Sequence, residues 1–324
     1  MPWNTSGCII TPKQGVCETG GIPVRAERIS SLSSEVKSEL AYQKEAVASA
    51  LAIAGIDRTP LQSWDPPLEG APSNFLEGIE QTRLREDSMV VQDFTNVPGY
   101  SFIRTLPYGA AIFEGQDRTK LTVILANRQP LEQLTGADLI YYNKRYKSFV
   151  MVQYKAMDRV GNAEPIFRLP NAQLNEELSR MDTILSSLRG AEHIEDHLGF
   201  RFSSNPFFLK LCSRIVFNPD DVSLVPGMYI PLDHWRLLAA SESITGSRGG
   251  QGITFKNVAR HLDNTSFIML VSQAWVGTTP AQSNMLEAAI RNTIESGRAI
   301  VIAVHAPTTV EPEVSAPVDT EDFL

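Results

Sequence analysis

The stretch GADLIYYNKRYKSFVMVQYKAMD, residues 136–158, decides which fold the sequence predicts. Two runs rich in β-branched and aromatic residues, 138–143 and 149–155, flank the basic segment KRYKS. Such runs are typical of neighbouring strands, and a short polar segment between them is typical of a hairpin loop. The sequence therefore predicts an antiparallel hairpin with a loop of medium length.

The pairing of this hairpin would bring three polar residues together. If Asn143 pairs with Val150, antiparallel pairing sets Asp138 opposite Lys155. Side chains alternate between the two faces of a sheet, so Asp138, Gln153 and Lys155 then share one face at one end of the hairpin. A register shifted by one residue would send Asp138 to the other face, so this prediction depends on the pairing.

The chemistry of these three residue types favours metal-assisted hydrolysis. A carboxylate and an amide oxygen, here from Asp138 and Gln153, are hard ligands that suit Mg²⁺. The ammonium of Lys155 can hold a water molecule or stabilise developing negative charge. A divalent cation lowers the pKa of its bound water toward neutrality and so supplies the nucleophile for phosphodiester cleavage. Asp138, Gln153 and Lys155 are therefore the candidate catalytic residues, with Mg²⁺ or Mn²⁺ as the candidate cofactor.

A further acid is expected at this site, because a neutral amide is a weaker ligand than a carboxylate. Glu132 precedes Asp138 in the segment PLEQLTGAD and is the first candidate. Glu80 and Glu86, on a predicted preceding helix, are the alternatives. The candidate metal ligands are therefore Asp138, Gln153 and Glu132.

The segments Gly136-Ala-Asp138-Leu-Ile and Val152-Gln153-Tyr-Lys155 resemble the pattern of the PD-(D/E)xK nuclease superfamily, and within it the Mrr-like restriction endonuclease domains, in which an Asp is followed after a hairpin by Gln-x-Lys. The resemblance implies a central mixed sheet flanked by helices, Mg²⁺ as the cofactor and hydrolysis of the DNA backbone as the reaction. It also implies a setting in restriction or in defence against foreign DNA.

The segments around the hairpin complete an α/β pattern. Apolar residues at helical intervals predict helices, and runs of β-branched and aromatic residues predict strands. The predicted helices cover about 30–54, 73–94 and 171–189, and the predicted strands cover 100–106, 110–115 and 120–126. The expected fold class is therefore α/β, with a central mixed β-sheet flanked by helices in a restriction-endonuclease-like core.

The pattern changes near residue 200, where an additional C-terminal α+β module is expected. The predicted elements of this module are the aromatic-rich runs FFLKLC and MYIPLDHW, a helix near 256–263, a strand-like run FIMLV, a helix over 281–296 and a strand over 299–304. The expected domains are an irregular and helical N-terminal segment at 1–70, a nuclease-like core at 71–200, the C-terminal module at 201–308 and a disordered acidic tail at 309–324.

Composition and charge restrict the classes of function. The 29 Lys plus Arg against 37 Asp plus Glu give a net charge of −8, which excludes a polybasic nucleic-acid coat. Any nucleic-acid site must be local, and residues 138–160 carry a net positive charge. Three cysteines are too few for a disulfide framework, and no apolar run approaches the ~18 residues that span a bilayer. The expected location is the cytoplasm, with nucleic acid, DNA in particular, as the partner and no membrane contact; a partner protein or a homo-oligomer is a further option.

Two alternatives stand beside the nuclease hypothesis. In the first, the hairpin is a half-buried strand pair in which Asp138 caps a turn and Lys155 is solvated at a strand end. In the second, the chain is a non-catalytic nuclease-like interaction protein that binds a partner protein through its C-terminal module. A C-terminal module that gates the nuclease is a third option.

Several weaker signals favour structural roles. His193 and His197 have the i, i+4 spacing of metal ligands but no evident third ligand. The large aromatic residues Trp235, Trp275, Phe207, Phe208 and Tyr229 are expected to pack in the core rather than to stack on bases. Cys212 follows an apolar run and is expected to be a buried, inert thiol.

Overall fold

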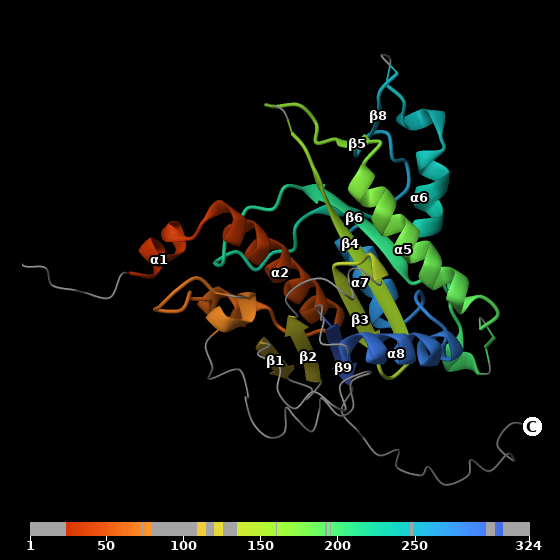
Figure 1. Cartoon of the computed structure of the whole chain (residues 1–324), viewed down its shortest axis with the longest axis horizontal. Helices are drawn as coiled ribbons and strands as arrows, with labels where there is room; N and C mark the ends of the chain where they lie inside the picture. Colours follow the sequence, from red (N-terminus) through yellow and green to blue (C-terminus); the bar gives the residue numbers. More distant parts are fainter. Residues whose placement is uncertain are drawn as a thin grey trace, which may run out of the picture.

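A seven-stranded mixed sheet forms the centre of the structure, which is a computed structural model, and helices lie on both of its faces (Figure 1). The α/β class and the mixed central sheet flanked by helices are therefore confirmed. The structure describes residues 24–72, 74–79, 109–114, 120–125, 135–159, 161–191, 193–194, 196–246, 249–295 and 302–306. Within these ranges no helix is long and apolar enough to cross a membrane.

The strands of the central sheet follow the order β1-β2-β9-β3-β4-β6-β7. Their bounds are β1 (Gly109–Glu114), β2 (Lys120–Leu125), β3 (Leu139–Asn143), β4 (Ser148–Met157), β6 (Phe207–Ser213), β7 (Gly227–Pro231) and β9 (Ile302–Ala306). β3 and β4 are antiparallel, whereas β6 is parallel to β4 and β9 is parallel to β3. A second, two-stranded sheet pairs β5 (Phe167–Leu169) with β8 (Gln251–Ile253).

Helices α2 (Ser34–Ile53) and α7 (Asn264–Ser272) cover one face of the sheet at β4, β6 and β7, and α5 (Ala172–Leu188) covers the other. α5 belongs to the connection that returns the chain from β4 to the parallel strand β6. The remaining helices are α1 (Arg25–Ser31), α6 (Leu232–Ala239) and α8 (Pro280–Glu295), with short 3-10 helices η1 (Thr59–Ser63), η2 (Phe75–Gly78), η4 (His197–Gly199) and η5 (Glu242–Ile244).

The predicted hairpin is confirmed, with a tighter turn than expected. Asn143 pairs with Ser148 rather than with Val150, so the loop shortens to Lys144–Lys147. The side-chain oxygen of Asn143 accepts hydrogen bonds from the backbone N–H groups of Arg145 and Tyr146, which stabilises the short turn. The register moves by two residues, and an even shift leaves every side chain on the face that was predicted.

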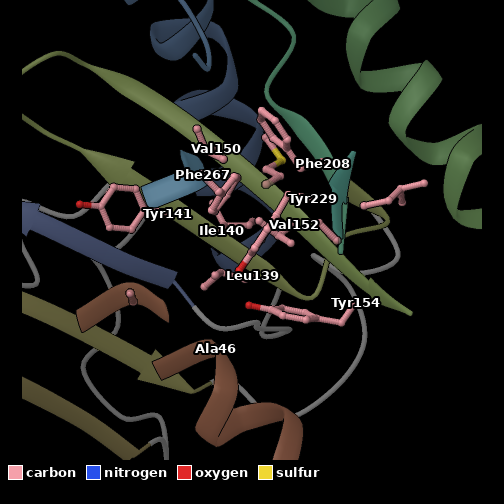
Figure 2. Close-up of a cluster of buried hydrophobic side chains, with 14 of the residues drawn as sticks. Ala46, Leu139, Ile140, Tyr141, Val150, Val152, Tyr154, Phe208, Tyr229 and Phe267 are labelled. Atoms are coloured by element: carbon pink, nitrogen blue, oxygen red, sulfur yellow. The ribbon is translucent and has the colours of Figure 1, made fainter. Parts of the chain in front are cut away.

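The β3–β4 hairpin lies in the main hydrophobic core (Figure 2). Every residue of β3 is buried, and only one residue of β4 is not. Burial of each large apolar side chain contributes about 1.5–3 kcal/mol, so the near-continuous apolar runs account for the central place of these two strands. The labelled core residues in Figure 2 are Ala46, Leu139, Ile140, Tyr141, Val150, Val152, Tyr154, Phe208, Tyr229 and Phe267.

Two predictions beyond residue 200 were wrong. The run FIMLV lies in helix α7, not in a strand, because the Asp263 side chain accepts from the backbone N–H of Ser266 and caps the helix. Phe267 and Val271, one helical turn apart, are both buried, whereas Met269 between them is 58% exposed. Residues 256–263 contain no helix in the structure.

The central sheet does not divide near residue 200. β6, β7 and β9 all follow that position in the chain, and they pair within the same sheet as β3 and β4. The sequence-based boundary therefore does not match a boundary between sheets. The predicted strand 100–106, the acidic tail 309–324 and all of the predicted helix 73–94 beyond residue 79 lie outside the described residues.

Candidate functional site

Asp138 lies directly before β3 and is held against the first half of the candidate Gln-x-Lys motif. Its backbone N–H donates to the carbonyl oxygen of Val152 at 2.9 Å. Its Oδ2 accepts from the backbone N–H of Tyr154 at 2.7 Å and from Nε2 of Gln153 at 2.8 Å. Two charge-assisted hydrogen bonds therefore orient this carboxylate toward β4.

Gln153 is the most unusual member of the group. Its side chain is buried, at 2% exposure, and its Nε2 donates both to Asp138 and, at 3.4 Å, to the carbonyl oxygen of Tyr154. Its Oε1 is buried and has no hydrogen-bond partner among the described residues. An unsatisfied buried acceptor costs about 1–3 kcal/mol, so it needs an explanation in structural or functional terms.

Lys155 lies two residues further along β4 and therefore faces the same side of the sheet as Gln153. Its Nζ contacts both carboxylate oxygens of Glu177, at 2.7 and 2.6 Å. Both residues are buried, with 7% of Lys155 and 1% of Glu177 exposed. The expectation of a solvated lysine at a strand end is therefore wrong.

Glu177 was missed by the sequence analysis, although a signal for it exists. It lies on α5 between Leu174 and Met181, at the helical spacing that places it on the same buried face. An acid in the apolar stripe of a helix is costly to bury unless it is paired, and here Lys155 pairs with it.

Gly136 allows α5 to approach the start of β3. Its φ is +65°, a conformation that favours glycine. A Cβ built at this position would lie 2.5 Å from the carbonyl oxygen of Glu177. Glu177 and the segment that leads into Asp138 are thus in direct backbone contact.

The structure therefore brings together Asp138, Gln153 and Lys155 and adds Glu177. The three acids that the sequence offered as a further ligand, Glu132, Glu80 and Glu86, lie outside the described residues. Among the residues that are described, no three His, Cys, Asp or Glu side chains form a group that could hold a metal ion. His193 and His197 likewise belong to no such group among the described residues.

A second buried ion pair lies on the opposite face of the same sheet. Lys210 of β6 pairs with Glu45 of α2, and neither side chain is more than 3% exposed. Burial by itself lowers the pKa of Lys210, but attraction to Glu45 and Tyr229 outweighs it, and the pKa is raised. The ammonium also lies 4.8 Å from the ring centre of Tyr229 and 5.7 Å from that of Tyr154.

Comparison of the chain with protein-family models, with curated proteins and with solved structures found no match.

Proposed function

We propose that this protein is a metal-dependent nuclease that hydrolyses DNA phosphodiester bonds, with a restriction-endonuclease-like core built from the β3–β4 hairpin, α5 and β6. The observation that carries the proposal is the buried amide of Gln153: its Nε2 donates to the carboxylate of Asp138, and its Oε1 has no hydrogen-bond partner among the described residues. The setting in restriction or defence against foreign DNA, and the cytoplasm as location, follow from the resemblance of the motif alone and belong to the same proposal.

The donor set fits a hard divalent cation. Rotation of the Gln153 amide by half a turn exchanges its oxygen and nitrogen. The oxygen would then lie beside Oδ2 of Asp138, an arrangement that is repulsive unless a cation neutralises it. Asp138 and Gln153 would hold Mg²⁺ or Mn²⁺ in this way, and water or one of the candidate acids Glu132, Glu80 or Glu86 would complete the coordination. When bound, such a cation lowers the pKa of its water and stabilises the charge on a phosphate.

Lys155 would act on the phosphate and its nucleophile. Its ammonium is held by Glu177 at a fixed place on the face that carries Asp138 and Gln153. A positive charge placed in advance stabilises the negative charge that develops in the transition state without having to reorganise. Glu177, which we assign as a positioning residue, fixes the ammonium of Lys155 in place through both of its carboxylate oxygens.

The experiment compares three variants on plasmid DNA with Mg²⁺ and with Mn²⁺. Asp138→Ala and Lys155→Met should each lower cleavage by at least about a hundredfold, the typical loss for one electrostatic group. Asp158→Ala is the matched control, because Asp158 directly follows β4 and its exposed carboxylate contacts Arg168 and Arg214 at the surface, at 3.8 and 3.6 Å. The proposal would be wrong if the Asp138→Ala and Lys155→Met variants both cleaved DNA as fast as the parent does.

One observation favours the non-catalytic alternative. Both oxygens of Glu177 already contact the ammonium of Lys155, as in a structural ion pair. An interaction protein with a nuclease-like sheet should bind neither Mg²⁺ nor Mn²⁺ in titration calorimetry and should bind no DNA at low salt. Cation binding that Asp138→Ala abolishes and Asp158→Ala preserves would exclude this alternative.

A further inference from the structure

A cluster of exposed aromatic rings lies near the turn of the hairpin, at the opposite end from Asp138. It consists of Phe200, Phe202 and Trp275, which are 45%, 67% and 40% exposed. The rings of Phe202 and Trp275 are stacked, with centres 5.0 Å apart and planes 16° apart, and Phe200 meets both edge-on. We call these three rings the aromatic platform. Contiguous apolar surface of this kind typically marks a binding site.

Backbone contacts hold the aromatic platform in place. The N–H of Phe202 donates to the carbonyl oxygen of Trp275 at 2.8 Å, and Ser203 and Val276 form a parallel bridge next to them. Arg201, between the two Phe residues, is buried, and its guanidinium donates to the carbonyl oxygen of Tyr146 in the hairpin turn at 2.7 Å. The aromatic platform is thus tied directly to the β3–β4 turn.

A pocket of about 270 Å³ lies at the same hairpin turn, and Tyr146, whose carbonyl oxygen accepts from Arg201, is one of the residues that line it. Leu198, two residues before Phe200, lines it, and so do the basic side chains of Arg145, Lys147 and His193. Among the described residues, Asp196 is the one acid that lines it, and its Oδ1 accepts from the backbone N–H of Gly199 at 2.8 Å. We call this the basic pocket. The positive charges of Arg145 and Lys147 would attract an anion, in a protein whose net charge is −8.

We propose that the aromatic platform and the basic pocket together bind single-stranded nucleic acid, with unpaired bases on Phe202 and Trp275 and a backbone phosphate in the pocket. Unpaired bases expose ring faces that stack on aromatic side chains, and phosphates follow positive charge. A partner protein would also cover exposed aromatic rings. Arg145 and Lys147 of the basic pocket, however, favour a ligand that carries both aromatic rings and negative charge, as nucleic acid does. This inference deepens the proposed function, since it adds a binding site for unpaired bases to a nuclease of DNA, and it rests on that function only for the choice of nucleic acid as ligand.

Binding is measured without divalent metal, so that failure of this inference and failure of the nuclease proposal are distinguishable. The probes are a fluorescent oligothymidine, an abasic strand of the same length and charge, and a duplex of the same length, each followed by anisotropy in EDTA. Oligothymidine should bind more tightly than both other probes. Equal affinity for the abasic strand would mean that the bases make no contact, and the proposal would be wrong.

The variants separate stacking from charge. Trp275→Ala should weaken oligothymidine binding by about 5- to 150-fold, the range for loss of one stacked base, and Trp275→Phe should restore most of it. Lys147→Ala should weaken binding of the abasic strand as well and reduce the salt slope by about 0.7 if one phosphate contact is lost. Leu237→Ala and Arg214→Ala are matched controls, because Leu237 is 75% exposed on α6 and the Arg214 side chain is 78% exposed.

Phe202→Ala provides a second test of the aromatic platform, and it should reproduce the loss seen with Trp275→Ala. Unchanged binding in both variants would overturn the proposal. If instead these variants change only self-association in sedimentation, or only binding to a purified partner protein, the aromatic platform is a protein docking surface and the proposal is wrong.

Discussion

The buried Lys155–Glu177 pair permits a quantitative test of its role. At 2.6–2.7 Å and an effective dielectric constant of about 20, the two charges attract each other by about 6 kcal/mol. Desolvation of two ions that are 7% and 1% exposed opposes most of this attraction. The net contribution of the pair to the free energy of unfolding is therefore small, whereas loss of one partner leaves an uncompensated buried charge.

We expect Lys155→Met and Glu177→Gln each to lower the free energy of unfolding by about 3–5 kcal/mol. The double variant Lys155→Met/Glu177→Gln should recover to within about 1–3 kcal/mol of the parent, since no buried charge remains and only the buried Gln amide loses a partner. DNA cleavage should behave differently, because the proposed chemistry needs the ammonium itself. The double variant should fold like the parent and cleave no DNA.

Equilibrium unfolding in guanidinium chloride measures stability, and plasmid cleavage with Mg²⁺ measures activity in the same preparations. The matched control is Lys210→Met/Glu45→Gln on the opposite face, where the new amide oxygen can still accept from the N–H of Val225. This control should retain cleavage. The reasoning fails if the single effects on stability add in the double variant, or if the Lys155→Met/Glu177→Gln protein still cuts DNA.

Two further predictions concern stability. Gly136→Ala should destabilise the protein by about 2–4 kcal/mol in denaturant unfolding, because its φ is +65° and the new Cβ would lie 2.5 Å from the Glu177 carbonyl oxygen. Gly161→Ala is the control: its φ is +57°, a new Cβ would meet no atom within 4 Å, and it should lose only about 1 kcal/mol of stability. Equal losses in the two variants would contradict the close packing at Gly136. Burial raises the pKa of Cys212 from 9.0 to about 11. Between these pH values the thiol is deprotonated in the unfolded state but still protonated in the folded state, so the free energy of unfolding falls by up to about 3 kcal/mol as pH rises. Cys212→Ala should remove that part of the alkaline loss, and identical unfolding curves against pH for parent and variant would refute it.

The hairpin and the face shared by its polar residues could be predicted from the sequence because both depend on local periodicity. Alternation along β3 and β4 assigns each side chain to a face, and the assignment survives the two-residue shift that the tight turn at Asn143 introduced. The exact partner of Asp138 could not be predicted, because turn length depends on hydrogen bonds from Asn143 to the loop backbone.

Features that depend on packing between distant segments were not predicted. Glu177 follows the periodicity of a buried helical face, but its role requires a lysine from β4, and the sequence alone does not place α5 over β4. The run FIMLV is too short for periodicity to separate a strand from a helix, and the deciding cap comes from Asp263 outside the run. Trp275 was expected in the core but is 40% exposed, and its ring stacks on Phe202 and meets Phe200 edge-on at the surface.

The asymmetry between the two buried Lys–Glu pairs supports a functional role for one face of the sheet. On the α2 face, Lys210 is enclosed by Glu45 and two tyrosine rings, and Glu45 also accepts from the N–H of Val225, so both charged groups of this pair have partners inside the core. On the α5 face, a comparable pair adjoins Gln153, whose Oε1 is unsatisfied, and Asp138, which is partly exposed to solvent. A purely structural pair needs neither an unsatisfied acceptor nor an accessible carboxylate beside it. A divalent cation bound by an oxygen of Asp138 and by the amide oxygen of Gln153 would account for both the unsatisfied acceptor and the accessible carboxylate.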